Sequence, residues 1–177
     1  MRTRLVGFTL FFIILTPLFI SLFLHNFGNN KFDVPIYYQE KFSKKLSCSN
    51  QIDFPYFLIS DSILEIGKKL KIIDVRFNDK SDVFTNNQIK RLLSNELFLD
   101  IYSISSHKLD LGWKTINFTF SDLNKYVKCK LLYNTNSSFI ILIDELGRVR
   151  GYYNSNSEDE FERLSAEIKI LNNFIKG

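Results

Sequence analysis

Few side chains in this 177-residue chain are suited to chemistry, and its two cysteines, Cys48 and Cys129, come first among them. Free thiolates bind soft metals and exchange with disulfides. In an exported domain the two could instead form one disulfide, which would close a loop of about 80 residues and stabilise the fold by about 4 kcal/mol. The sequence alone cannot show whether the two sulfurs lie close enough to bond. A disulfide and two separate thiols therefore both remain as interpretations.

Oxygen and nitrogen ligands are the second kind of candidate. Asp79, Asp82 and His107 are side chains of the right type, but their positions suggest simpler roles. We expect Asp79 and Asp82 to be turn and helix-cap residues, and His107 to be an exposed loop residue. We therefore predict no metal site, and the alternative ligand set is Cys48, His107 and Cys129.

No other catalytic arrangement stands out in the sequence. The two histidines, His25 and His107, have no evident nucleophile to pair with. The seven glycines are scattered, so none forms a loop that could cradle a phosphate. We therefore predict that the protein is not an enzyme and that it has no catalytic or cofactor-binding residues.

The N-terminus predicts a membrane anchor. Arg2 and Arg4 precede an apolar run from Leu5 to Leu24, which as a helix would span about 30 Å, enough to cross a bilayer core. The arginines place the N-terminus in the cytoplasm and the rest of the chain in the periplasm. A cleaved signal peptide is the competing interpretation, but no small-residue cleavage site follows Leu24. We favour an uncleaved single-pass anchor in the cytoplasmic membrane.

The charge balance excludes nucleic acid as a partner. The net charge is +4, and without Arg2 and Arg4 the chain carries 21 basic and 19 acidic residues. This is too small an excess for an electrostatic surface that binds nucleic acid. The densest basic cluster is Lys68, Lys69 and Lys71, which we expect to be a solvated loop before a strand.

The chain divides into an anchor at residues 1–25, a tether at 26–53 and a folded domain at 54–177. Within the domain we expect strands at 56–59, 70–77, 98–104, 139–143 and 148–153, and helices at 85–96, 122–129 and from a Ser157–Glu160 capping box to about 174. A parallel β-α-β unit followed by an antiparallel hairpin and a terminal helix is the thioredoxin-like arrangement. The expected core-facing residues of the helices are Ile89, Leu92, Leu93, Leu123, Tyr126, Val127, Phe161, Leu164, Ile168, Leu171 and Ile175.

Several stretches resemble the Sco/SenC family, in the form typical of Bacteroidetes-like bacteria. The sequences "FIILIDELGRVRGYY" and "EDEFERLSAEIKIL" resemble the end of that family, and "FGNNKFDVPIYYQ" resembles the segment after its anchor. Cys48 and "PYFLISDSIL" fall where the subgroup has a single cysteine and a short strand containing proline. The resemblance implies an α/β, thioredoxin-like (Sco-type) domain after an N-terminal transmembrane helix.

The resemblance also implies a copper site, which this chain lacks. Sco-like proteins deliver copper to the binuclear centre of cytochrome c oxidase, and some reduce disulfides there. They use a CxxxC motif after the first central strand and a histidine before the penultimate one. Residues 78–84, after "KIIDVRF", contain no cysteine, and residues 133–138 contain no histidine. The segment between Ser106 and Trp113 is also shortened to six residues.

We therefore expect a Sco/SenC-like protein that has lost its copper and redox ligands. Such a protein would be a binding or accessory factor in the assembly of cytochrome oxidase or its copper centre. Its partners would be oxidase assembly proteins or an intact Sco-like homologue, and no cofactor is expected. The alternative is an active copper-binding or thiol-redox protein that uses the displaced ligands Cys48, His107 and Cys129. A third alternative is a decaying copy with no selected role.

Overall fold

A computed structural model of the chain describes residues 13, 15–23, 33–40, 48, 54–55, 69–77, 82–95 and 99–176. The chain separates into two compact units, Met1–Asp33 and Val34–Gly177. The boundary therefore lies inside the segment predicted as a tether. The predicted strand at 56–59 and Asp79 lie outside the described residues.

The first unit contains part of the predicted anchor. Residues 13 and 15–23 are helical, and most of their side chains are exposed. Among the described residues, no helix has both the length and the hydropathy needed to cross a bilayer. The rest of the predicted span, residues 5–12, 14 and 24, lies outside the description.

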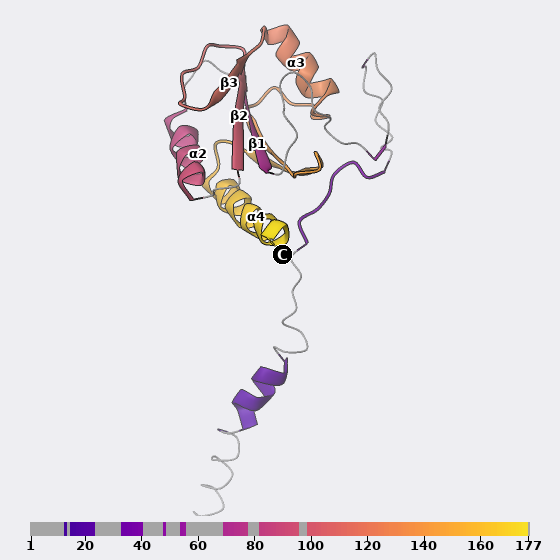
Figure 1. Cartoon of the computed structure of the whole chain (residues 1–177), viewed down its shortest axis with the longest axis vertical. Helices are drawn as coiled ribbons and strands as arrows, with labels where there is room; N and C mark the ends of the chain where they lie inside the picture. Colours follow the sequence, from indigo (N-terminus) through magenta and orange to yellow (C-terminus); the bar gives the residue numbers. More distant parts are fainter. Residues whose placement is uncertain are drawn as a thin grey trace, which may run out of the picture. The chain divides into compact units, whose positions relative to one another are not determined.

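The second unit is built on one mixed sheet of five strands (Figure 1). The strands are β1 (Leu70–Arg76), β2 (Leu99–Ser105), β3 (Lys114–Asn117), β4 (Phe139–Ile143) and β5 (Val149–Asn154), in the order β3-β2-β1-β4-β5. The helices are α2 (Val83–Asn95), α3 (Phe120–Cys129) and α4 (Glu158–Lys176). β1, β2 and β3 are parallel, and β4 is antiparallel to both of its neighbours, β1 and β5.

This order confirms the expected arrangement of elements. β1, α2 and β2 form the parallel β-α-β unit, and β4 and β5 form the antiparallel hairpin that α4 follows. The edge strand β3 was not predicted. It is four residues long and exposed at both ends, so it carries no hydrophobic period, and its pairing with β2 holds it in place.

The two faces of the sheet are covered by different helices (Figure 1). Because successive side chains of a strand point to opposite faces, Ile73 and Val75 pack with residues of α3, whereas Leu70 and Ile72 pack with residues of α2 and α4. β1 is buried along its whole length. It is therefore the central strand, as its β-branched sequence predicts.

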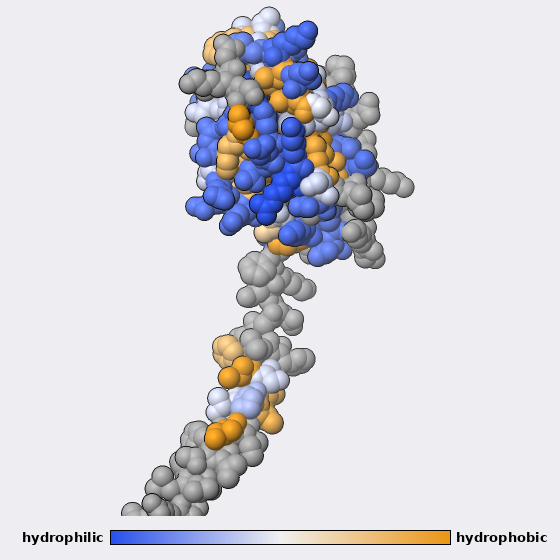
Figure 2. Space-filling model, turned by 90° about the vertical axis from the view of Figure 1, so that its left-hand side faces the viewer, coloured by the Kyte–Doolittle hydropathy of each residue, from blue (hydrophilic) through white to orange (hydrophobic). Residues whose placement is uncertain are grey.

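The outer surface along α2 is mostly polar. Figure 2 shows the side of the molecule on which α2 lies in Figure 1, and hydrophobic side chains appear there as small separate patches among hydrophilic ones. Such scattered apolar residues are ordinary for a protein surface.

The buried helix faces agree with the sequence analysis except at one residue. Ile89 and Leu92 are buried, but Leu93 is 37% exposed, so its placement on the core face was wrong. The buried residues of α2 are Thr85, Ile89 and Leu92, and Leu93 lies at the edge of the face that they form. The other predicted core residues whose side chains are described are buried, namely Leu123, Tyr126, Val127, Phe161, Leu164, Ile168 and Leu171.

The basic cluster is not a solvated loop throughout. Lys71 lies within β1 and is only 2% exposed, and its Nζ donates to the carbonyl oxygen of Lys69 at 3.1 Å. Burial accordingly lowers the pKa of Lys71. Lys69 is exposed and its Nζ pairs with Asp100 at 3.0 Å, while Lys68 lies outside the described residues. The long aliphatic stem of a lysine allows this burial, because its ammonium can reach a polar group at the end of the strand.

Residues of the β4–β5 hairpin bind Val34, the first residue of the second unit. The Asp144 carboxylate accepts from Arg148 Nε at 2.6 Å and lies 3.4 Å from Arg150 Nη1. Gly147 has a φ of +80°, which favours glycine. Arg150 Nη2 then donates to the carbonyl oxygen of Val34 at 2.6 Å, and Val34 is buried. Part of the predicted tether is thus packed on the domain.

Tyrosines extend this packing. The backbone N–H of Tyr37 donates to the carbonyl oxygen of Val149 at 2.9 Å. The hydroxyl of Tyr38 donates to the carbonyl oxygen of Leu132 at 3.0 Å, and the hydroxyl of Tyr152 lies 3.0 Å from that of Tyr38. Two aromatic residues of the predicted tether therefore lie against the domain.

We predict that Gly151→Ala destabilises the domain. An alanine Cβ at this position would overlap the Tyr153 hydroxyl, so the tyrosine ring would have to move. That ring donates a hydrogen bond to Glu167 at 2.5 Å and lies under the Arg163 guanidinium at 4.5 Å. The free energy of unfolding, measured in urea, should fall by about 1–3 kcal/mol. An unchanged midpoint would show that Tyr153 can move at no cost.

Candidate functional site

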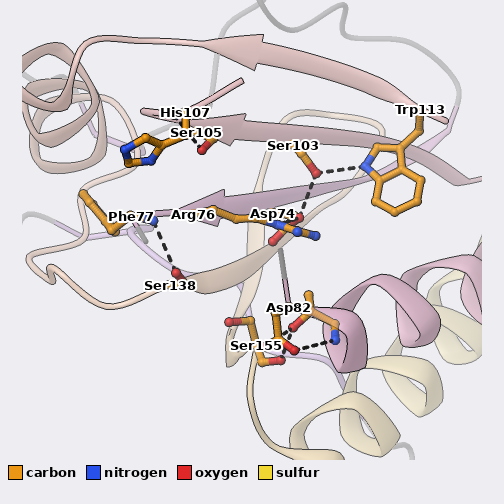
Figure 3. A network of polar contacts seen from close by, with 11 residues as sticks. Asp74, Arg76, Phe77, Asp82, Ser103, Ser105, His107, Trp113, Ser138 and Ser155 are labelled. Atoms are coloured by element: carbon orange, nitrogen blue, oxygen red, sulfur yellow. Dashed lines mark hydrogen bonds and ion pairs between the residues drawn. The ribbon is translucent and has the colours of Figure 1, made fainter. Parts of the chain in front are cut away.

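A buried polar cluster lies at the carboxyl ends of β1 and β2 (Figure 3). Asp74 is paired in register with Ser103, and Arg76 with Ser105, and all four residues are buried. The alternation of the strand places Asp74 and Arg76 on the face that α2 and α4 cover. In α/β sheets, ligands bind next to the carboxyl ends of parallel strands.

One chain of hydrogen bonds connects the cluster to the loop before β3. Arg76 Nε donates to Asp74 Oδ2 at 2.6 Å. Ser103 Oγ donates to the same carboxylate oxygen at 2.7 Å, and accepts from Trp113 Nε1 at 2.8 Å. Trp113 is the only tryptophan of the chain. Figure 3 shows Asp74 and Arg76 side by side on β1, with Ser103 and Trp113 to one side.

The pair at the centre of the cluster is only partly satisfied. Among the described residues, Asp74 Oδ1, Arg76 Nη1 and Arg76 Nη2 have no hydrogen-bond partner. Burial raises the pKa of Asp74 more than the Arg76 charge and the Ser103 hydroxyl lower it, and the Asp82 charge raises it further. Buried polar atoms without partners are costly, and three of them here belong to one ion pair.

The start of α2 closes one side of the cluster. Asp82 Oδ1 accepts from the backbone N–H groups of Phe84 at 3.0 Å and Thr85 at 3.4 Å, which confirms the prediction of a helix cap. The hydroxyl of Thr85 lies 2.8 Å from the carbonyl oxygen of Ser155 and 3.0 Å from Asp82 Oδ2. The hydrogen bond between Thr85 and Ser155 connects the first turn of α2 to the segment after β5.

His107 is half-buried rather than exposed, which corrects the sequence-based expectation. It follows β2, its backbone N–H donates to Ser105 Oγ at 3.0 Å, and its Nδ1 lies 3.0 Å from Ser106 Oγ. The two serine hydroxyls thus hold the residue at the same edge as the polar cluster (Figure 3). An exposed loop was expected because the short segment after β2 is polar.

The two cysteines are bonded to each other. Cys48 and Cys129 form a disulfide with a Cα–Cα distance of 5.6 Å, and Cys129 is the last residue of α3. Within the part of the chain that the structure describes, no three histidine, cysteine or acidic side chains are grouped so that they could hold a metal. The structure therefore brings Cys48 to Cys129, but it does not add His107 to them as a third ligand.

A pocket of about 350 Å³ adjoins the cluster. It lies between α2 and the loop before β3, and Trp113 forms part of its wall. Lys90 and Asp110 give it one basic and one acidic side chain. Trp113 therefore contacts both this pocket and, through Ser103, the buried Asp74.

The cluster brings a carboxyl group, a guanidinium and two serine hydroxyls together out of solvent, and no thiol lies among its residues. The sequence analysis missed Asp74, Arg76, Ser103 and Trp113 as site residues. The available signal was the pair of charged residues at alternate positions inside an otherwise apolar central strand, because charged residues are almost never fully buried unless they are paired.

Comparisons with known proteins do not assign the chain to a family. No protein-family model matches the chain. It is 31% identical over 104 residues to the ATP synthase subunit delta of Mycoplasma mobile, and the match spans 58% of this chain and 57% of that protein.

Solved structures that are similar to the chain include Sco family proteins. BsSco, a member of the Sco family of cytochrome c oxidase assembly proteins, gives a TM-score of 0.47 at 12% identity, over 61% of this chain and 82% of that one. A SCO1/SenC family lipoprotein from Bacillus anthracis gives 0.45 at 16% identity, over 60% and 83%. Both TM-scores are below 0.5, so membership of the family stays a proposal.

We predict that Asp74→Asn changes how stability depends on pH. Burial raises the pKa of Asp74 in the folded chain above its ordinary value of 3.8. Protonated Asp74 therefore contributes to the stability of the folded chain, and this contribution is fully present below about pH 4. This contribution is lost as the pH rises through the raised folded-state pKa, and asparagine cannot ionise. The unfolding free energy of the wild type relative to Asp74→Asn should therefore fall as the pH rises above about 4.

Urea unfolding at a series of pH values measures this difference. Asp110→Asn, which removes an exposed carboxylate near Trp113, is the matched control for loss of one charge. If the difference in unfolding free energy between the wild type and Asp74→Asn stays constant with pH, the raised pKa of Asp74 is contradicted.

Proposed function

We propose that the chain is a membrane-anchored, Sco/SenC-like accessory protein that acts by binding another protein in cytochrome oxidase or copper-centre assembly. Its partner would be an oxidase assembly protein or an intact Sco-like homologue that carries the copper. In this proposal the domain is not an enzyme, holds no copper and exchanges no thiols.

The observation that carries the proposal is what stands at the carboxyl end of β1. The resemblance expects two thiols immediately after this strand, and the strand instead ends in the buried pair of Asp74 and Arg76. The two cysteines that the chain does have, Cys48 and Cys129, are bonded to each other. A cysteine in a disulfide offers no thiolate for copper or for exchange. What remains for function is therefore the shape and charge of the surface.

The proposed location rests on two further observations. Arg2 and Arg4 precede the apolar run, and residues 15–23 of that run are helical. Disulfides such as the one between Cys48 and Cys129 persist in oxidising compartments, of which the periplasm is one. Both support an anchor in the cytoplasmic membrane with the second unit outside the cytoplasm.

We predict that deleting the gene lowers the amount of assembled cytochrome oxidase and leaves copper uptake unchanged. A binding factor helps to assemble the oxidase, whereas a copper carrier would also alter the handling of the metal. Oxidase can be measured from its haem absorbance in membranes, and copper by elemental analysis of the cells.

The deletion strain should be complemented with the wild type and with a variant that lacks residues 1–25. Recovery with the wild type alone supports a role at the membrane. Normal oxidase in the deletion strain would remove the proposal, and a parallel fall in cellular copper would favour a metal carrier.

The alternative function, copper or thiol chemistry at displaced ligands, is favoured by one observation. Cys48 and Cys129 are adjacent, so reduction of their disulfide would leave two thiols side by side, and two soft sulfurs suit Cu(I). Among the described residues no third ligand joins them. A competitive Cu(I) titration of the purified full chain against a chromophoric chelator tests this alternative.

We predict no competition at sub-micromolar affinity, either with the disulfide intact or after its reduction. Tight one-to-one binding by the reduced chain, abolished in Cys48→Ser/Cys129→Ser, would instead establish the alternative. The variant His107→Ala would then show whether the histidine moves to join the two sulfurs, since it would weaken binding only in that case.

A further inference from the structure

The pocket beside Trp113 has two walls that carry opposite charges. One wall is α2, where Asn86 and Lys90 lie one turn apart and so share a side of the helix. The other wall is the loop at residues 110–113, which contributes Asp110 and the ring of Trp113. The pocket volume of about 350 Å³ lies within the range of small-molecule sites in proteins. The pocket therefore has room for a small organic molecule.

Both walls are held in place by hydrogen bonds. Trp113 Nε1 donates to Ser103 Oγ at 2.8 Å, and Figure 3 shows the indole on the side of the sheet where α2 lies. The start of α2 is fixed by its Asp82 cap and by the hydrogen bond between Thr85 and Ser155. Because the indole N–H is already bonded, Trp113 offers the pocket the apolar surface of its ring. A site whose walls are fixed beforehand loses less free energy in ordering them on binding.

The loop wall is open in front of Gly112. This glycine has a φ of +77°, a backbone conformation that favours glycine, and an added Cβ would meet no atom within 4 Å. Gly112 is exposed and lines the pocket between Asp110 and Trp113. A ligand can therefore reach the ring of Trp113 from solvent without displacing a side chain at this position.

The charges of the pocket favour a ligand that carries both signs. Lys90 and Asp110 are exposed, and among the described residues neither forms an ion pair or a side-chain hydrogen bond. A simple anion that binds Lys90 would be repelled by Asp110, and a simple cation that binds Asp110 would be repelled by Lys90. A zwitterion pairs favourably with both side chains.

We propose that the pocket between α2 and the loop at residues 110–113 binds a small zwitterion of the amino-acid type with an apolar side chain. Its carboxylate binds the ammonium group of Lys90, its own ammonium group binds the carboxylate of Asp110, and its side chain packs on the ring of Trp113. A free amino acid and a short peptide both carry these groups, at different spacings. This site is independent of the proposed role in oxidase assembly, and either can fail without the other.

The test titrates the purified full chain in detergent with phenylalanine and, separately, with the dipeptide glycyl-phenylalanine. Trp113 is the only tryptophan and lies in the pocket wall, so its fluorescence reports occupancy, and calorimetry measures the heat of binding. We expect a saturable change in both signals, and the tighter of the two ligands distinguishes a free amino acid from a peptide. Glycine should bind more weakly because it has no side chain to pack on Trp113. No saturable signal with phenylalanine or the dipeptide would overturn the proposal.

Two capped ligands test the two charge contacts separately. N-acetylphenylalanine lacks the ammonium group, and phenylalaninamide lacks the carboxylate. Each should bind about two- to fivefold more weakly than phenylalanine, because each loses one contact between exposed charges. If both capped ligands bind as tightly as phenylalanine, the ligand is not recognised as a zwitterion and the proposal is wrong.

Two variants assign each contact to its residue. Lys90→Gln should weaken the binding of phenylalanine but not of phenylalaninamide, which has no carboxylate for Lys90. Asp110→Asn should weaken the binding of phenylalanine but not of N-acetylphenylalanine, which has no ammonium group for Asp110. The matched controls Lys125→Gln in α3 and Asp159→Asn in α4 remove exposed charges that do not line the pocket and should leave every affinity unchanged. Wild-type affinity for phenylalanine in both Lys90→Gln and Asp110→Asn would place any binding elsewhere and overturn the proposal.

Discussion

The structure depends on one constraint, the burial of a charged pair in its central strand. β1 lies between β2 and β4 and has no exposed residue, yet it carries Asp74 and Arg76 near its carboxyl end. The pair is stabilised by its own short ion pair and by Ser103, which its parallel register with β2 places beside Asp74. Removing either residue would leave buried polar groups of the other without a partner, which costs more than keeping the pair. The register of β2 against β1 is thus tied to the same contacts that form the candidate site.

Different contacts are made at the two ends of the central strand, β1. At its amino end, the β4–β5 turn carries Asp144, whose carboxylate organises Arg148 and Arg150 and so holds Val34 on the domain. At the carboxyl end, the buried pair of Asp74 and Arg76 lies where helix α2 begins, capped by Asp82. The amino end therefore holds the start of the second unit on the domain, whereas the carboxyl end carries the buried pair.

Much of the fold was predictable because its elements carry their own periodicity. The apolar run of β4 indicates a strand, and the spacing of three and four residues between Phe161, Leu164 and Ile168 indicates a helix. β3 and the burial of Lys71 were not predictable, because both depend on neighbours that are distant in sequence. The site was missed for the same reason. Asp74 and Arg76 look like interruptions of an apolar strand until Ser103 and Trp113 are placed around them.

The buried pair also bears on the alternative that the chain is a decaying copy. Replacing a buried ion pair with apolar residues of similar size is often neutral or stabilising, so drift has no reason to preserve one for stability alone. Drift would also be expected to break such a network one partner at a time, at a cost of several kcal/mol for each uncompensated charge. Here Arg76, Asp74 and Ser103 still fit one another, and Trp113 extends the same chain of hydrogen bonds. The network joins β1, β2 and the loop before β3, and its hydrogen bonds hold only while all of its members are present.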